Sequence, residues 1–124
     1  MRMLAVSSPP SVVVVDDEAA FGRSLVLLLE SRGQPAIGVT SAFDALEAMG
    51  DGLAVGLVLV DVRMPEIDGC DFVRAMGYLF PEVSCALMSA YPANDEDLPP
   101  GVPFLEKPFV VDDVLGLLAS RPPR

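Results

Sequence analysis

Three short apolar runs of this chain end in charged residues, and this arrangement constrains the fold more than any other feature. Residues 12–15, four valines, run into Asp16-Asp17-Glu18; residues 57–60 run into Asp61; residues 102–105 run into Glu106-Lys107. Apolar runs without alternation are typical of parallel strands that are covered on both faces. If these runs are neighbouring parallel strands, their charged ends meet at one sheet edge, where open α/β sheets place their binding sites.

The rest of the chain alternates helical and strand patterns around these runs. We expect strands over residues 11–16, 35–39, 56–60, 83–88 and 102–105, and helices over residues 18–32, 42–50, 70–79 and 111–120. Gly33 ends the first helix, and Pro35 places the second strand at an edge because proline cannot donate to a ladder. The alternation predicts a parallel sheet with helices on both faces. Residues 91–101 contain three prolines, so a fourth helix is short or absent, with only residues 94–98 able to form one or two turns.

Length and composition indicate one globular domain that does not bind nucleic acid. The chain has 124 residues, is 52% hydrophobic and carries a net charge of −10, which repels DNA, RNA and anionic membranes. We expect a flexible lead over residues 1–10, a domain over residues 11–120, and a tail or the start of a linker over residues 121–124. The lead lacks the layout of a signal peptide, and no apolar stretch is long enough for a membrane span.

The cysteines and the missing histidine narrow the chemistry. Cys70 and Cys85 are too few and too far apart for a disulfide framework or a metal site, so we interpret them as reduced structural residues of a cytoplasmic protein. Without histidine the chain cannot perform Ser-His-Asp or Cys-His catalysis. The five phenylalanines other than Phe104 are most simply packing residues.

The charged strand ends predict a phosphoryl-transfer site. Asp16, Asp17 and Asp61 supply the oxygen ligands that Mg²⁺ prefers, and without a cation or Lys107 their charges would repel one another. Asp61 could act as a nucleophile and form an acyl phosphate. A metal ion and a lysine would neutralise the transferring group, and Ser89, at the end of the fourth predicted strand, could donate to a phosphoryl oxygen.

These motifs together resemble the receiver domain of two-component response regulators. Asp16-Asp17 resembles the acidic metal-binding pair, Asp61 in Asp61-Val62-Arg63-Met64-Pro65 the phosphoacceptor, and Asp68-Gly69 the turn into the third helix. Ser89-Ala90 resembles the hydroxyl switch residue with its small successor, Phe104 the aromatic switch, and Lys107-Pro108-Phe109 the lysine with its following proline. The similarity covers residues 11–120 and implies a flavodoxin-like, doubly wound, five-stranded parallel sheet in the order 2-1-3-4-5.

The resemblance implies a signalling phosphoacceptor and not an enzyme, apart from slow Mg²⁺-dependent autodephosphorylation. A histidine kinase or a histidine phosphotransfer protein would phosphorylate Asp61. Asp17, Asp61 and the backbone carbonyl of Arg63 would hold Mg²⁺ or Mn²⁺, with Asp16 helping through water. Lys107 and Ser89 would contact the phosphoryl group, Phe104 would turn inward, and a cis Lys107–Pro108 bond is expected.

Some positions depart from the family pattern or leave the function open. The eroded fourth helix predicts that the output surface is built on the first helix or on residues 92–103, and a phosphorylation-linked homodimer would need another face than usual. Arg63 and Tyr91 are bulky at positions that tune access of water, which predicts a slowly decaying phosphoryl group. One alternative is a pseudo-receiver that acts as a constitutive interaction module. A hydrolase of the haloacid dehalogenase type is disfavoured, because Arg63 stands where a second aspartate is needed.

Overall fold

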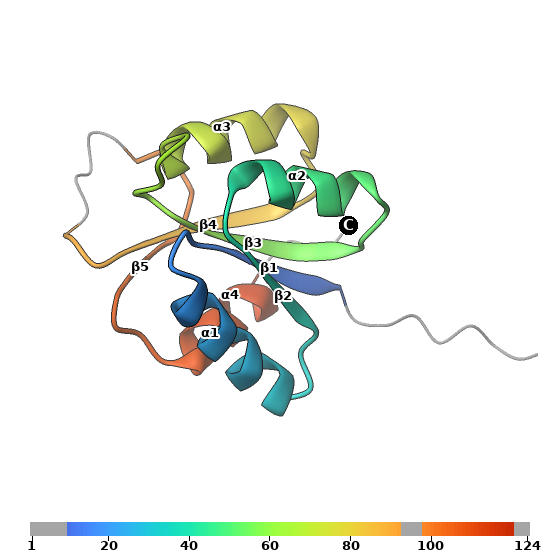
Figure 1. Cartoon of the computed structure of the whole chain (residues 1–124), viewed down its shortest axis with the longest axis vertical. Coiled ribbons are helices and arrows are strands. Elements are labelled where there is room, and N and C mark those ends of the chain that lie inside the picture. The colour runs from blue at the N-terminus through green and yellow to red at the C-terminus, as the bar shows by residue number, and fades with distance from the viewer. Residues whose placement is uncertain (1–9, 93–97, 121–124) are drawn as a thin grey trace, which may run out of the picture.

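A computed structural model describes residues 10–92 and 98–120 as one parallel sheet between two helical layers (Figure 1). The strands are β1 (Ser11–Val15), β2 (Ala36–Val39), β3 (Val55–Asp61), β4 (Ser84–Ser89) and β5 (Phe104–Glu106). The helices are α1 (Ala19–Ser31), α2 (Ala42–Gly50), α3 (Gly69–Leu79) and α4 (Val111–Ala119). The sheet order is β2-β1-β3-β4-β5 with every neighbouring pair parallel, which confirms the predicted doubly wound, flavodoxin-like fold.

The sheet separates two apolar cores. On one face α2 and α3 pack against the sheet through Ala45, Phe72 and Met76, and on the other face α1 and α4 pack through Leu29 and Val114. The central strands β1 and β3 are buried along their whole length, because helices cover both of their faces. The unbroken valine run of β1 is therefore core on both sides.

The connection between β4 and β5 departs from the regular alternation. Its described residues, 90–92 and 98–103, contain no helix, so the helix predicted over residues 111–120 is the fourth one of the described chain. The turns that the sequence allowed over residues 94–98 fall outside the described residues except for Leu98. The predicted lead over residues 1–10 and tail over residues 121–124 also lie outside the described residues, except for Pro10.

Helix ends follow local sequence signals. Gly33, just past α1, has a φ of 78°, a left-handed conformation that glycine adopts without strain. The Ser41 side chain caps α2 by accepting from the backbone N–H of Asp44 at 3.0 Å. Asp68 caps α3 in the same way, accepting from the backbone N–H of Cys70 at 2.7 Å.

Two expectations need correction. The last strand begins at Phe104 and not at Val102, because Pro103 has no N–H to donate and only its carbonyl joins the ladder, by accepting from Leu87. The sequence predicts Phe43 to be a packing residue, but its side chain is 71% exposed.

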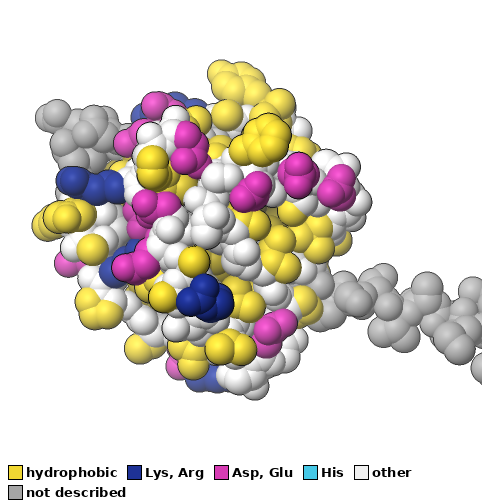
Figure 2. Space-filling view, viewed as in Figure 1, with side chains coloured by type: hydrophobic (Ala, Val, Ile, Leu, Met, Phe, Trp, Pro, Cys, Tyr) yellow, Lys and Arg dark blue, Asp and Glu magenta, His cyan; other side chains and the backbone are white. Residues whose placement is uncertain are grey.

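None of the helices in the described residues is long and apolar enough to cross a membrane. Figure 2 shows acidic side chains spread over the visible face, as expected from the net charge of −10.

Candidate functional site

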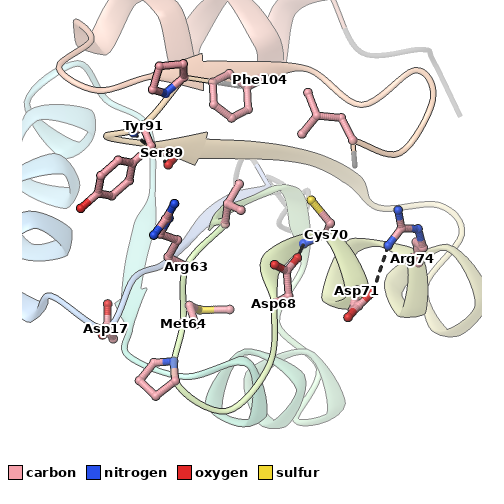
Figure 3. A pocket seen from close by; sticks show the side chains of 14 residues that line it. Asp17, Arg63, Met64, Asp68, Cys70, Asp71, Arg74, Ser89, Tyr91 and Phe104 are labelled. Atoms are coloured by element: carbon pink, nitrogen blue, oxygen red, sulfur yellow. Dashed lines mark hydrogen bonds and ion pairs between the residues drawn. The ribbon is translucent and has the colours of Figure 1, made fainter. Parts of the chain in front are cut away.

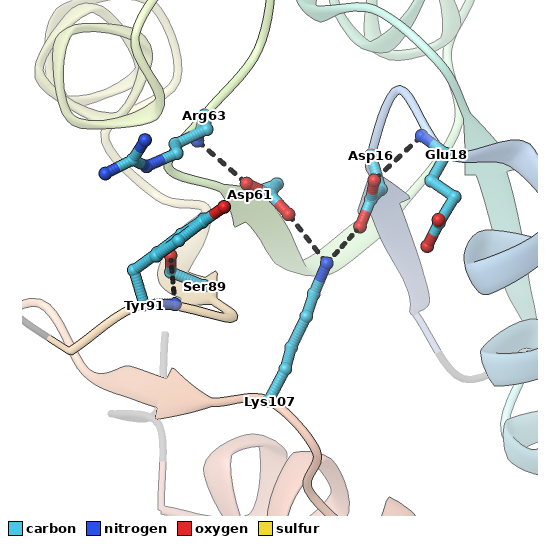
Figure 4. A network of polar contacts seen from close by, with 7 residues as sticks. All are labelled: Asp16, Glu18, Asp61, Arg63, Ser89, Tyr91 and Lys107. Carbon is cyan, nitrogen blue, oxygen red and sulfur yellow. Dashed lines mark hydrogen bonds and ion pairs between the residues drawn. The ribbon is translucent and has the colours of Figure 1, made fainter.

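The structure brings the charged ends of β1, β3 and β5 together at one sheet edge (Figure 4). The Lys107 Nζ lies 2.6 Å from Asp16 Oδ2 and 2.6 Å from Asp61 Oδ2. Only 2% of the Asp16 side chain and 11% of the Asp61 side chain are exposed, against 14% for Lys107. Lys107 thus forms one largely buried ion-pair network with Asp16 and Asp61, which lie 91 and 46 positions before it in the chain. The sequence predicted that these residues meet together with Asp17, and of the three acids Asp16 and Asp61 are the ones paired with Lys107.

The backbone around these side chains fixes their positions. Asp61 is the last residue of β3 and pairs with Met88 of β4, so its carboxylate lies where the strand leaves the sheet. The remaining carboxylate oxygens accept backbone N–H groups two residues on: Asp16 Oδ1 from Glu18 at 2.9 Å, and Asp61 Oδ1 from Arg63 at 2.7 Å. The backbone N–H of Lys107 donates to the carbonyl of Ser89 at 2.8 Å, and the Lys107–Pro108 bond is cis, as predicted.

Two buried carboxylates share a single ammonium group, so the network carries one excess negative charge. Burial raises the pKa of Asp16 above its ordinary value of 3.8, although the hydrogen bonds from Lys107 and from the backbone of Glu18 act in the opposite direction. For Lys107, burial lowers the pKa, but the hydrogen bonds that it donates to Asp16 and Asp61, together with the negative charge of both carboxylates, raise the pKa overall. Lys107 is the only lysine of the chain, so no other lysine can replace it.

The acidic side chains match the ligand preference of a hard divalent cation. All the ionisable ligands at this edge are carboxylates, and their charge exceeds that of Lys107. Asp17 differs from the buried pair, because it is exposed and lines the neighbouring cavity. Within residues 10–92 and 98–120, no three acidic, cysteine or histidine side chains already form a metal-binding group. Asp17 would therefore have to turn toward Asp61 to share a cation with it.

A cavity of 920 Å³ opens beside Asp61, and two of the four predicted phosphoryl-contact and switch residues, Ser89 and Phe104, line it (Figure 3). Asp17, Arg63, Ser89, Tyr91 and Phe104 all line it. Ser89 is buried, and its Oγ accepts from the backbone N–H of Tyr91 at 3.1 Å. Its successor, Ala90, is exposed at the end of β4 and offers no side chain that could obstruct the site.

Arg63 and Tyr91 meet across the mouth of this cavity. The guanidinium carbon of Arg63 lies 4.0 Å from the centre of the Tyr91 ring, which is a cation–π contact. Each residue stands two positions beyond a functional side chain, Arg63 after Asp61 and Tyr91 after Ser89. The sequence predicted that both residues lie close to Asp61, but their direct contact is a finding of the structure.

Sequence reasoning missed two further contacts around the site. Glu66 Oε1 accepts from the backbone N–H of Ala42 at 3.2 Å and so ties the β3–α3 loop to the first turn of α2. The ring of Phe21 lies under the Lys107 ammonium, with 4.1 Å between Nζ and the ring centre. No local pattern could have found either contact, because each joins residues far apart in the sequence.

The two cysteines are free and take no part in the network. Cys70 is buried at the start of α3, and Cys85 is partly buried in β4. Burial raises the pKa of both thiols to about 11, so both are protonated and unreactive near neutral pH. Their structural role agrees with the interpretation from the sequence.

Comparison with known sequences identifies one family. Residues 12–117 match the response regulator receiver domain. The transcriptional regulatory protein FixJ of Bradyrhizobium diazoefficiens is 37% identical over 116 residues, which cover 88% of this chain and 55% of FixJ. The sensor kinase CckA of Brucella abortus is 36% identical over 109 residues, which cover 83% of this chain and 11% of CckA. The chain therefore spans about half the length of FixJ and a small part of CckA.

Solved structures give the same result. A response regulator receiver protein from Pseudomonas putida superposes with a TM-score of 0.82 and is 30% identical, covering 94% of this chain and 100% of that chain. The beryllofluoride-activated NtrC4 receiver domain dimer has a TM-score of 0.75 at 26% identity, covering 88% and 93% of the two chains. Receiver domains are signalling phosphoacceptors that work with histidine kinases and output domains and generally bind Mg²⁺ at their acidic site. From the sequence match, the sheet order and the shared architecture, this chain belongs to the response regulator receiver domain family.

Proposed function

We propose that this chain is a phosphorylation-switched signalling domain that accepts a phosphoryl group on Asp61 from a histidine kinase or a histidine phosphotransfer protein. The observation that supports this most directly is the pairing of one lysine with two buried carboxylates at 2.6 Å. The cavity of 920 Å³ next to this network, lined by Asp17, Arg63 and Ser89, offers space for a transferred group. Family membership supports the same role.

In the proposed reaction a carboxylate oxygen of Asp61 attacks the phosphorus of a partner phosphohistidine. The new O–P bond forms as the N–P bond breaks, and the leaving imidazole nitrogen keeps the electron pair. Lys107 already contacts the Asp61 carboxylate and lies close enough to neutralise the incoming phosphoryl oxygens. Asp17, Asp61 and the Arg63 carbonyl would hold Mg²⁺, with Asp16 acting through water, and the ion would add further charge neutralisation.

The switch would follow from new contacts to the phosphoryl group. The Ser89 hydroxyl accepts from the Tyr91 backbone in this structure, so its own proton is available for a phosphoryl oxygen. Ala90 leaves room beside it, and Phe104 lines the cavity into which it would turn. Phosphorylation would thus bias a packing equilibrium in β4 and β5.

The contact between Arg63 and Tyr91 would slow the loss of the phosphoryl group. Hydrolysis requires water to approach the phosphorus opposite the Asp61 oxygen. The stacked guanidinium and ring narrow the mouth of the cavity beside Asp61. A long-lived phosphorylated state would suit a regulator whose signal persists.

The output surface would lie away from the usual fourth helix. No helix stands between β4 and β5 in the described residues, so we propose that α1 or residues 92–103 carry the signal. NtrC4 is solved as a receiver dimer, and a phosphorylation-linked homodimer is proposed for this chain through a different face. An output domain or partner is proposed because FixJ is about twice as long as the matched region.

Intact-mass spectrometry after incubation with acetyl phosphate tests this function. We expect one phosphoryl adduct that needs Mg²⁺ and is absent from Asp61→Asn, whose amide is a poor nucleophile. Asp68→Asn is the matched control, because Asp68 lines the neighbouring cavity and caps α3 but makes no ion pair with Lys107. No adduct in the folded wild-type protein would reject the proposal and favour a pseudo-receiver that acts as a constitutive interaction module.

A further inference from the structure

The Lys107 ammonium is enclosed by three groups, and only two of them are carboxylates. An ammonium group has three N–H donors. Asp16 Oδ2 and Asp61 Oδ2 each lie 2.6 Å from Nζ, and the centre of the Phe21 ring lies 4.1 Å from it. The aromatic face thus occupies a side of the cation that would otherwise be open to water or to a third polar group.

We propose that Phe21 is a positioning residue for phosphoryl transfer, holding the Lys107 ammonium against Asp61 through a cation–π contact. This inference rests on the proposed phosphoacceptor function. The negative face of an aromatic ring attracts a cation, most strongly where both are shielded from water. Phe21 is half-buried and the Lys107 side chain is 14% exposed, so water screens this contact only partly.

An aromatic ring can hold the Lys107 ammonium in place in a way that a polar side chain could not. A third carboxylate would increase the negative charge of a network that already holds one excess charge, and it would compete with the phosphoryl oxygens for Lys107. The ring attracts the ammonium but carries no net charge and forms no directional hydrogen bond. The ammonium can therefore shift from Asp16 toward a phosphoryl group on Asp61 while it stays on the same ring face.

The surroundings of Phe21 hold the ring in place. Phe109 packs edge-on against it, with 6.0 Å between the ring centres and an angle of 74° between the planes. Phe109 lies two residues after Lys107, so the segment that carries the cation also holds the ring. Phe21 also belongs to the first turn of α1, three residues after Glu18, whose backbone N–H donates to Asp16. One helix start thus contacts both members of the Asp16–Lys107 ion pair.

A spectroscopic test measures the contact without any chemistry. Because Lys107 is the only lysine, lysine-selective isotope labelling gives a single set of side-chain NMR signals. A ring face next to Nζ shifts the ε-methylene protons upfield. We expect this shift to disappear in Phe21→Leu, which keeps an apolar side chain, and to persist in Phe21→Tyr, which keeps the ring. Phe80→Leu in the opposite core is the control and should leave the shift unchanged.

A kinetic test measures the consequence. With acetyl phosphate and Mg²⁺, we expect Phe21→Leu to lower the phosphorylation rate constant by about three- to tenfold, the lower part of the range that a cation–π contact spans. Phe21→Tyr should recover most of the wild-type rate constant, and Phe80→Leu should match the wild type. A small phosphodonor is used because it needs no protein docking surface, so a substitution in α1 cannot act through the binding of a partner protein.

The outcomes separate this inference from the proposed function. If wild-type protein is not phosphorylated, the phosphoacceptor function fails first. If wild-type protein is phosphorylated but Phe21→Leu reacts at the same rate, or keeps the upfield shift, Phe21 does not position Lys107. Equal slowing in Phe21→Leu and Phe21→Tyr would likewise overturn the inference, because it would assign the effect to packing and not to the ring face.

Discussion

Replacing Lys107 with methionine should reveal how strongly the fold depends on a single cation. Methionine keeps an unbranched apolar side chain but leaves Asp16 and Asp61 facing each other without a counter-charge. Their side chains are only 2% and 11% exposed, so water can compensate little. Removing one partner of a buried ion pair costs about 3–5 kcal/mol. We expect the free energy of unfolding to fall by about 3 kcal/mol at pH 7.5, at the lower end of this range because Asp61 keeps some solvent access. The melting temperature should fall by about 10 °C.

Urea unfolding followed by far-ultraviolet circular dichroism, with EDTA present, measures this loss directly. The matched control is Arg23→Met in α1, which changes the net charge equally but removes an exposed side chain and should stay within about 0.5 kcal/mol of wild type. The double variant Lys107→Met with Asp16→Asn leaves only one buried carboxylate. It should recover more than half of the lost stability.

Two results would refute this reasoning. A loss below about 1 kcal/mol in Lys107→Met would mean that the carboxylates separate or hydrate without the lysine, contrary to the magnitude expected for a buried pair. An equal loss in the single and double variants would mean that the lysine stabilises the fold through its packing. In either case the unbalanced charge of Asp16 and Asp61 would not be the cause of the stability lost in Lys107→Met.

Three further predictions address the turn, the charge and the cavity mouth. Gly69→Ala should destabilise the fold by about 2–3 kcal/mol in urea unfolding, because the new Cβ would lie 2.3 Å from the backbone oxygen of Asp61. Gly77→Ala, on the same helix, is the control: its Cβ meets open space, so the variant should be as stable as wild type or more stable by up to about 1 kcal/mol. Native Asp16 holds its proton more tightly than Asp16 of the unfolded chain, so its contribution to the free energy of unfolding should fall as pH rises from about 3.8 through the native pKa, and urea unfolding of Asp16→Asn should lack this contribution to the pH slope. Arg63→Ala and Tyr91→Ala should each accelerate loss of the phosphoryl group in a mass-spectrometric time course, with the double variant no faster than the singles, and unchanged decay would contradict the proposal that the Arg63–Tyr91 contact restricts access of water.

Much of the fold was predictable because its strongest signals are local. The valine run of β1 marks a doubly covered strand, and Gly33 and Asp68 mark helix ends. The exposure of Phe43 was not predictable, because the periodicity of α2 does not say how wide its buried face is. The start of β5 was missed because the apolar character of residues 102–105 outweighed the missing donor of Pro103.

The site was predictable only in part. The convergence of Asp16, Asp61 and Lys107 follows from parallel strands that end at one edge, so strand order alone sufficed. The contacts of Glu66 with α2 and of Phe21 with Lys107 depend on how a loop and a helix settle on the sheet. Side-chain contacts of this kind leave no periodic pattern in the sequence, and only the three-dimensional structure reveals them.

Lys107 serves both the fold and the proposed chemistry, so no substitution of Lys107 can separate the two roles. Its loss removes the counter-charge of two buried carboxylates and also the group that would meet the phosphoryl oxygens. Phe21→Leu changes no charge and keeps an apolar side chain, so it should alter where the ammonium stands and not whether it is present. If Lys107→Met loses both stability and phosphorylation while Phe21→Leu loses mainly phosphorylation, the position of the cation limits the reaction as well as its charge. If Phe21→Leu behaves like wild type, the two carboxylates alone hold Lys107 well enough, and the ring contributes only packing.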